Sequence, residues 1–168
     1  SSLARSPAPP PPGPPLRPPA SLHLPVNSST MGLSDFANKK FKLASSDKFD
    51  DYMKALGVSF VTRQVGNAVS PVVHMTVDGD QYTLTSESTF KTSTISFKLG
   101  EPFDQETPDG RKVKATIVLE GDNTLVETQD PQGSGKATKI VREFSASEIK
   151  MTLTVDSIVC TRIYKLQE

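Results

Sequence analysis

Residues 149–166 read IKMTLTVDSIVCTRIYKL. Apolar and polar side chains alternate through the first half, which is the period of a β-strand with one buried face. That face would carry Ile149, Met151, Leu153 and Val155. The second half, Ile158–Leu166, alternates again and places Ile158, Cys160, Arg162, Tyr164 and Leu166 on one face. The stretch therefore predicts β-structure, with an arginine on a largely apolar face.

The same pattern extends upstream, where turn signals separate the β-like runs. The signals are Asp78-Gly79, Asp109-Gly110 and Gly121-Asp122-Asn123, and the first is a strong two-residue hairpin signal. Short strands roughly every ten residues predict an antiparallel meander. Because roughly nine or ten strands would leave long exposed edges in an open sheet, we expect the sheet to close into a barrel.

Helical spacing is confined to a short region before the strands. Phe49, Tyr52, Met53 and Leu56 recur at helical intervals, with Ser46 or Asp47 as the expected N-cap and Gly57 as the stop. A second helix is expected at Phe60–Ala68, and a first strand at Asn38–Ser45. The sequence thus predicts two helices inserted after the first strand.

Residues 1–30 have a different composition from the rest of the chain. They hold 10 of the 14 prolines, so we expect a disordered proline-rich extension, followed by a folded domain at 31–168. Pro12, Pro15 and Arg17 fit the pattern read by polyproline-binding domains. The alternative is a solvated tail without a partner, because such a pattern arises readily in any proline run with scattered arginines.

Charge and cysteine content exclude some classes of protein. The chain has 19 basic and 19 acidic residues, and without Arg5 and Arg17 of the extension the balance is 17 to 19. A near-neutral domain argues against nucleic-acid binding. The single cysteine, Cys160, allows no internal disulfide and fits a reducing compartment. With no apolar run of signal-peptide length, we expect a cytoplasmic protein.

Two arginines lie on strand faces that the alternation of apolar residues predicts to point inward. Arg142 shares a face with Ile140 and Phe144, and Arg162 shares one with Tyr164. A buried arginine cannot lose its charge, so it needs an anionic partner. Because the acids cluster on turns and polar faces, we expect that partner to be a ligand carboxylate. The alternative is that both arginines point outward and pair with surface acids.

The chain contains a series of short motifs whose order and spacing together are informative. They are Lys48-Phe49-Asp50-Asp51-Tyr52-Met53, Ser88-Thr89-Phe90-Lys91, Ile95-Ser96-Phe97-Lys98-Leu99-Gly100, Asp109-Gly110-Arg111-Lys112-Val113-Lys114, Ile140-Val141-Arg142-Glu143-Phe144 and Cys160-Thr161-Arg162-Ile163-Tyr164. With this order and spacing, residues 35–168 resemble the cytosolic fatty-acid-binding proteins, especially the heart and insect-muscle branch.

The resemblance implies an all-β fold: a ten-stranded antiparallel up-and-down β-barrel with a helix-turn-helix lid. It implies a monomer, without cofactor or metal, that binds and transports long-chain fatty acids. The family's carboxylate-binding motif falls on Arg142, Arg162 and Tyr164. Positions of the cavity and its portal fall on Phe49, Met53, Pro71, Phe90, Pro108 and Asp109, and Met151 joins them from the inward face of its strand.

Other functions remain as alternatives. An interaction protein would use the proline-rich extension to recruit a partner while the barrel senses lipid. A secreted lipocalin would carry a signal peptide and usually cysteine pairs. An enzyme is not indicated, because Cys160 has no histidine near it in sequence and no phosphate loop or metal-ligand spacing is present. Lys54 and Arg63 on the lid are candidates for transient membrane contact, or part of an ordinary solvated face.

Overall fold

The computed structural model describes residues 4, 6–15 and 32–167. Residues 6–15 are exposed and form neither helix nor strand; most of the extension predicted to be disordered lies outside the described residues. The elements are the 3-10 helix η1 (Leu33–Phe36), β1 (Lys40–Asp47), α1 (Phe49–Ala55), α2 (Phe60–Ala68), β2 (Val72–Asp78), β3 (Gln81–Glu87), β4 (Thr92–Lys98), β5 (Phe103–Glu106), β6 (Lys112–Glu120), β7 (Thr124–Pro131), β8 (Thr138–Phe144), β9 (Glu148–Val155) and β10 (Ile158–Leu166).

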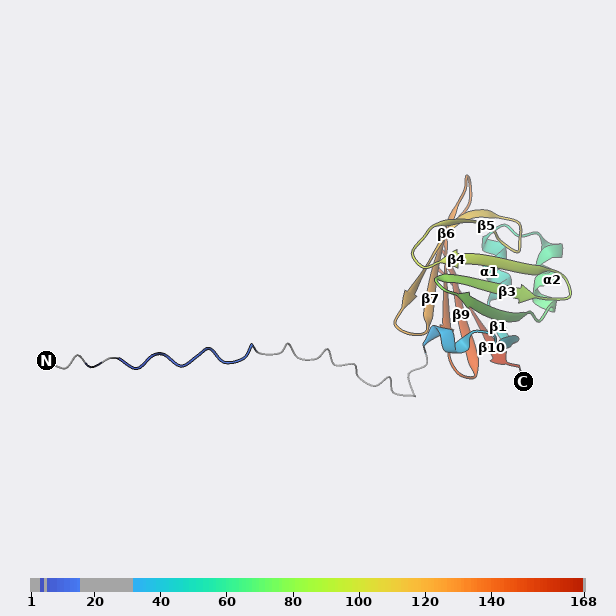
Figure 1. Ribbon diagram of the computed structural model, residues 1–168. Coiled ribbons are helices and arrows are strands. Elements are labelled where there is room, and N and C mark those ends of the chain that lie inside the picture. Colours follow the sequence, from blue (N-terminus) through green and yellow to red (C-terminus); the bar gives the residue numbers. More distant parts are fainter. Residues whose placement is uncertain (1–3, 5, 16–31, 168) are drawn as a thin grey trace.

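All ten strands belong to one antiparallel sheet that curls into a barrel (Figure 1). The order is β4-β3-β2-β1-β10-β9-β8-β7-β6-β5, so all strands that follow one another in sequence are neighbours in the sheet except β4 and β5, and β1 pairs with β10. The two edge strands, β4 and β5, are not hydrogen-bonded to each other, and the rings of Phe97 and Phe103 stack across this gap with centroids 5.9 Å apart. The predicted ten-stranded barrel is confirmed.

Alternation along the strands determines which side chains fill the interior. On β9, Ile149, Leu153 and Val155 are buried and Met151 is half-buried, whereas Lys150 is exposed. The same period on β6 buries Val113, Ala115 and Ile117, whereas Leu119, the next residue of that alternation, is 37% exposed near the end of the strand. The main apolar cluster consists of Leu33, Phe36, Phe41, Met75, Leu84, Phe97, Ile117, Leu125, Phe144, Ile149 and Tyr164. A second cluster packs Tyr52 of α1 against Ile140, Leu153, Val155 and Cys160 of the barrel.

The two helices follow β1 directly, and their boundaries correct one prediction. The N-cap of α1 is Lys48, in the left-handed region with φ of 62° and without a side-chain cap, not Ser46 or Asp47. Those two residues remain in β1, paired with Arg162 and Thr161 of β10. The second helix spans Phe60–Ala68 as predicted, and the Ser59 hydroxyl accepts a hydrogen bond from the Thr62 amide at 3.3 Å.

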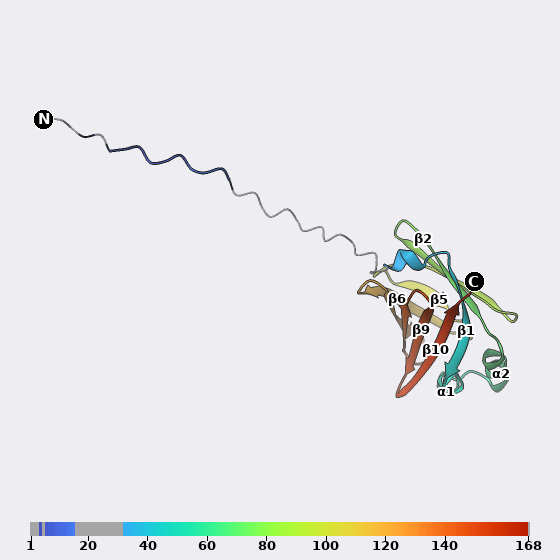
Figure 2. The same cartoon turned by 90° about the horizontal axis from the view of Figure 1, so that it is seen from below.

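The barrel has two different ends (Figure 2). At one end η1 acts as a plug: Leu33 and Phe36 are buried, and the Phe36 ring stacks on Phe144 at 5.8 Å. At the other end lie α1 and α2, packed so closely that a Cβ added at Gly66 would lie 3.1 Å from the Met53 sulfur. In the described part of the chain, no helix has the length and apolar character to cross a membrane. The two ends of the barrel are therefore covered by different elements, η1 at one end and the α1–α2 pair at the other.

Candidate ligand-binding site

Both inward-leaning arginines lie on the inner face of the barrel. Met151 of β9 is paired with Arg142 of β8 on one side and with Arg162 of β10 on the other. Residues directly opposite one another on neighbouring antiparallel strands point to the same face, so the three form one row. Arg162 is 4% exposed, and the Arg142 side chain is 13% exposed. The predicted inward orientation is therefore confirmed.

The direct contacts of the Arg162 guanidinium are with neutral groups. Its Nε donates a hydrogen bond to the Tyr164 hydroxyl at 3.3 Å, and its Nη1 makes a long contact of 3.5 Å with the Ser46 hydroxyl. Its guanidinium lies 3.7 Å from the centre of the Phe49 ring, a cation–π distance. Among the described residues, no carboxylate forms an ion pair with it. Arg162 is thus a buried cation without an acidic partner in this part of the chain.

Arg142 has an acidic partner inside the barrel. Its Nη1 donates to Oε1 of Glu127 at 2.8 Å, and Glu127 of β7 is fully buried. The expectation that acids occupy only turns and polar faces is therefore wrong for Glu127. The reason lies in the alternation of β7, where Leu125, Glu127 and Gln129 share one face and are all buried. Because Leu125 points toward the core, Glu127 two positions later points inward as well.

A chain of buried polar side chains continues from this ion pair. Gln129 donates from Nε2 to the second oxygen of Glu127, and the Thr138 hydroxyl donates to Gln129 Oε1 at 2.7 Å. Both oxygens of the Glu127 carboxylate therefore have partners, as a buried charge requires. The sequence analysis missed Glu127, Gln129 and Thr138; polar residues at alternate positions beside Leu125 were the available signal.

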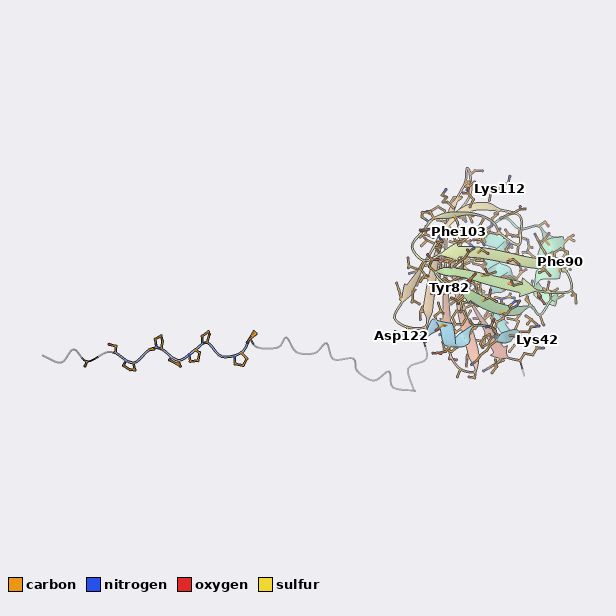
Figure 3. The ribbon with its side chains drawn as sticks, in the orientation of Figure 1. Lys42, Tyr82, Phe90, Phe103, Lys112 and Asp122 are labelled. Atoms are coloured by element: carbon orange, nitrogen blue, oxygen red, sulfur yellow. The ribbon has the colours of Figure 1, made fainter. Side chains whose placement is uncertain are left out.

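The other predicted positions gather near the helix end. Phe49 lies over Arg162, Met53 is buried between the helices, and Pro71, half-buried at the start of β2, accepts a hydrogen bond from the Leu43 amide at 2.9 Å. Phe90 is 60% exposed in the β3–β4 turn, at the end where α2 lies (Figure 3). The structure thus brings residues predicted from different parts of the sequence to one end of the barrel.

The β3–β4 and β5–β6 turns touch at this end. Lys91 Nζ donates to the carbonyl oxygen of Pro108 at 3.4 Å. Asp109 mainly organises its own turn, because its carboxylate accepts from the Thr107 hydroxyl and from Arg111 Nε, each at 2.7 Å. Pro108 is exposed and Asp109 is half-buried. Both residues therefore lie at the rim rather than deep in the barrel.

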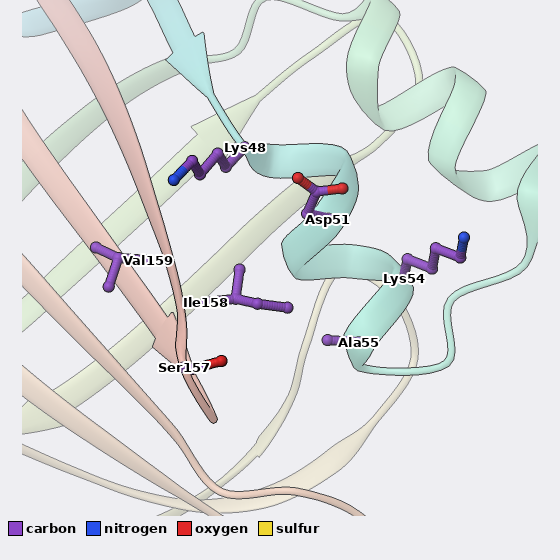
Figure 4. Close-up of a pocket in the computed structure, with 7 residues that line it drawn as sticks. All are labelled: Lys48, Asp51, Lys54, Ala55, Ser157, Ile158 and Val159. Atoms are coloured by element: carbon purple, nitrogen blue, oxygen red, sulfur yellow. The ribbon is translucent and has the colours of Figure 1, made fainter.

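Two hollows flank α1, and only one reaches the arginine row. A cavity of about 300 Å³ lies between β1, α1 and α2, and Arg162 forms part of its wall with Leu43 and Phe49. The other hollow, of about 400 Å³, lies between α1 and the β9–β10 turn, where Ile158 faces Ala55 (Figure 4). None of the predicted site residues lines this larger hollow, so the smaller cavity is the relevant one.

Burial keeps two nearby titratable groups neutral. It raises the pKa of the Cys160 thiol from its ordinary value of 9.0 to about 11, although Arg162 acts in the opposite direction. It also raises the pKa of the Tyr52 hydroxyl above 10.0. A thiol that stays protonated at neutral pH is a poor nucleophile, so Cys160 acts as a small wall residue.

The comparison with known families decides the classification. Residues 39–167 match the model of the lipocalin / cytosolic fatty-acid binding protein family. The chain belongs to this family. The resemblance predicted from the sequence is thereby confirmed, and the arginine row lies within the matched residues.

Individual relatives of the family agree with this membership. The chain is 46% identical over 136 residues to the muscle fatty acid-binding protein of Schistocerca gregaria, covering 80% of this chain and 99% of that protein. Among solved structures, a fatty acid-binding protein from Drosophila melanogaster brain tissue has 55% identity and a TM-score of 0.72, covering 77% of this chain and 98% of that one. The Schistosoma mansoni fatty acid binding protein in complex with arachidonic acid has 42% identity and a TM-score of 0.77, covering 82% and 100%. The barrel of this chain thus matches nearly the full length of each of these relatives.

Proposed function

We propose that this member of the family binds long-chain fatty acids non-covalently inside the barrel and transports them in the cell. The observation that carries the proposal is Arg162, a buried cation that has only neutral partners among the described residues. Leaving such a charge uncompensated is costly. A fatty acid carboxylate supplies the missing anion, and its hydrocarbon tail suits the apolar wall.

The proposed anchor consists of Arg142, Arg162 and Tyr164. Arg162 and Tyr164 are already in hydrogen-bond contact, so a carboxylate that accepts from both would find them oriented. Arg142 lies in the same row but is engaged by Glu127. It therefore adds its remaining N–H donors to a head group whose main partner is Arg162.

The tail would lie against Met53 of α1, Met151 of β9 and the apolar residues near them. Transfer of a hydrocarbon chain out of water contributes about 0.8 kcal/mol per buried methylene, so affinity comes mainly from the tail and orientation from the anchor. Entry would require movement at the helix end, where Phe90, Pro71, Pro108 and Asp109 surround the opening. The Schistosoma mansoni protein in complex with arachidonic acid supports this choice of ligand class.

Cargo transfer would involve contact with membranes through α2. Phe60 and Val61 are 62% and 69% exposed on this helix, which gives it an apolar outer surface. Lys54 is exposed on the adjacent helix, whereas Arg63 is held by Asp50 at 3.2 Å and by the Val58 carbonyl at 2.7 Å. Of the two cations expected to contact lipid, Lys54 is therefore the available one.

The remaining expectations stay predictions from the sequence. They concern a cytoplasmic monomer without enzymatic activity and, as the second function, recruitment of a polyproline-binding partner. Pro12 and Pro15 are exposed, while Arg17 lies outside the described residues. Capture of a polyproline-binding domain by the full chain, lost on changing Pro15 and Arg17, would support recruitment, and equal capture by the altered chain would contradict it.

The test of the main proposal is a titration with a long-chain fatty acid and its matching alcohol, on wild type and Arg162→Gln. We expect the wild type to prefer the acid, and the variant to lose about tenfold or more in acid affinity, because a charge-assisted hydrogen bond contributes about 1.5–3 kcal/mol. Lys165→Gln is the control, since it removes a cation from the exposed side of the same strand. Equal binding of acid and alcohol, unchanged by Arg162→Gln, would contradict the anchor.

A further inference from the structure

The charge enclosed by the barrel wall comes from few residues. Among the described residues, the inward-facing charged side chains of the arginine row and its neighbours are Glu127, Arg142 and Arg162. The exposed residues Lys48, Asp50 and Asp51 also line the cavity beside Arg162, and Arg63 binds Asp50 at 3.2 Å, so these two cations and two acids cancel. The other buried polar side chains, Thr107, Gln129 and Thr138, are uncharged. Burial keeps Cys160 and Tyr52 protonated at neutral pH. At the rim, Asp109 and Arg111 pair with each other at 2.7 Å and cancel.

The interior therefore carries one net positive charge. Glu127 contributes one negative charge against the two positive charges of Arg142 and Arg162, and it cancels the first of them through a direct ion pair of 2.8 Å. One singly charged anion beside Arg162 makes the interior neutral. A doubly charged anion would leave an uncompensated negative charge beside buried side chains, where charges interact more strongly than in bulk water.

We propose that Glu127 determines the charge of the head group that the barrel accepts, so that lipids with a singly charged head group bind and lipids with a doubly charged phosphate monoester are rejected. This inference rests on the proposed function, because it concerns the same interior anchor. It assigns to Glu127 a role in specificity, exerted through Arg142, and it makes Arg162 the one interior cation left for the ligand.

The position of Glu127 argues for such a role. Its carboxylate is fully buried and bound on both oxygens, by Arg142 on one side and by Gln129 on the other. Thr138 in turn donates a hydrogen bond to Gln129, so any movement of the carboxylate would break hydrogen bonds on both of its sides. If Glu127 only held β7 to β8, its replacement by glutamine would change stability but would not change which head group is preferred.

The experiment uses three probes with the same tail: tetradecanoate, tetradecyl sulfate and tetradecyl phosphate. At pH 8 the carboxylate and the sulfate carry one charge, whereas the phosphate monoester carries close to two, since its second pKa is about 6. Sulfate and phosphate heads have the same shape, so their comparison isolates charge. Binding is measured by calorimetry at low micromolar ligand, with circular dichroism confirming that the barrel stays folded.

We expect the wild type to bind the phosphate about tenfold or more weakly than the sulfate. Glu127→Gln keeps the size of the side chain and one acceptor oxygen but replaces the other oxygen by an NH2 donor. The interior then gains one positive charge, and we expect the ratio of phosphate to sulfate affinity to rise about tenfold or more. Asp104→Asn is the matched control, because Asp104 is an exposed acid outside the barrel, paired with Lys114. It should leave the ratio unchanged.

The outcomes separate the two proposals. A ratio that is the same in wild type and Glu127→Gln would overturn the role of Glu127 even if tetradecanoate binds tightly. Failure of the wild type to bind tetradecanoate would instead overturn the proposed function. If Glu127→Gln does not fold, Glu127→His provides a second side chain that is largely neutral at pH 8, and equal binding of sulfate and phosphate by the wild type alone would also overturn the inference.

Discussion

At the scale of single residues, burial gives Cys160 a measurable effect on stability at alkaline pH. The unfolded thiol loses its proton near pH 9, whereas the buried thiol keeps it until about pH 11. Between these values the folded state binds more protons, so the free energy of unfolding falls as the pH rises. A shift of two pKa units corresponds to a loss of about 2–3 kcal/mol.

The measurement is urea unfolding of wild type and Cys160→Ala between pH 8 and pH 11. We expect the alanine variant to be less stable at pH 8, because it leaves a small cavity, but to lose less stability as the pH rises. The pKa of Tyr52 is raised mainly by burial and to the smallest extent by Cys160, so Tyr52 acts in the same direction in both proteins and most of its contribution cancels from the difference. Parallel curves would contradict the account.

The same residues show what alternation can and cannot predict. Arg142 and Arg162 were predicted to face inward because their strands place apolar residues two positions away. Glu127 was missed because the inward direction of β7 depends on its pairing with Ile117 of β6 and Ile140 of β8. The pairing register between strands cannot be seen in the local sequence pattern. From that pattern alone, a charged residue is predicted to be exposed.

At the scale of elements, the junction between β1 and α1 stores strain in one residue. Lys48 adopts a left-handed conformation with φ of 62°, which costs an L-residue about 1–2 kcal/mol and glycine little. We therefore expect Lys48→Gly to raise the free energy of unfolding by about 1 kcal/mol. Lys54→Gly, within α1, should lower it by about 0.5–1 kcal/mol. Chemical denaturation measures both, and a loss of stability in both variants would contradict the assignment of strain.

Element boundaries were predictable where a local signal marks them. The second helix was placed correctly because its apolar residues recur at helical spacing, and in the structure Ser59 caps it. The first strand was expected at Asn38–Ser45 but spans Lys40–Asp47. Asn38 has a left-handed conformation with φ of 65° and donates its amide to the Met75 carbonyl at 2.7 Å, while β10 extends the pairing to Asp47. The shift comes from partners distant in sequence.

At the scale of the whole molecule, the barrel has one end plugged by η1 and one end covered by α1 and α2. We expect substitutions at the two ends to differ in their effects on stability and on ligand exchange. Phe36 of η1 is buried against Phe144, so Phe36→Ala should lower the free energy of unfolding by about 3–5 kcal/mol. Phe90 is mostly exposed at the helix end, so Phe90→Ala should change stability by less than about 0.5 kcal/mol.

Ligand exchange should show the opposite dependence. If fatty acid enters at the helix end, Phe90→Ala accelerates both association and dissociation, because it removes a large side chain from the opening, while Phe36→Ala leaves these rates as they are. Stopped-flow displacement of a fluorescent fatty acid measures the rates. Faster exchange in Phe36→Ala with unchanged exchange in Phe90→Ala would place the entrance at the plugged end, and the direction of loading proposed for this barrel would have to be reversed.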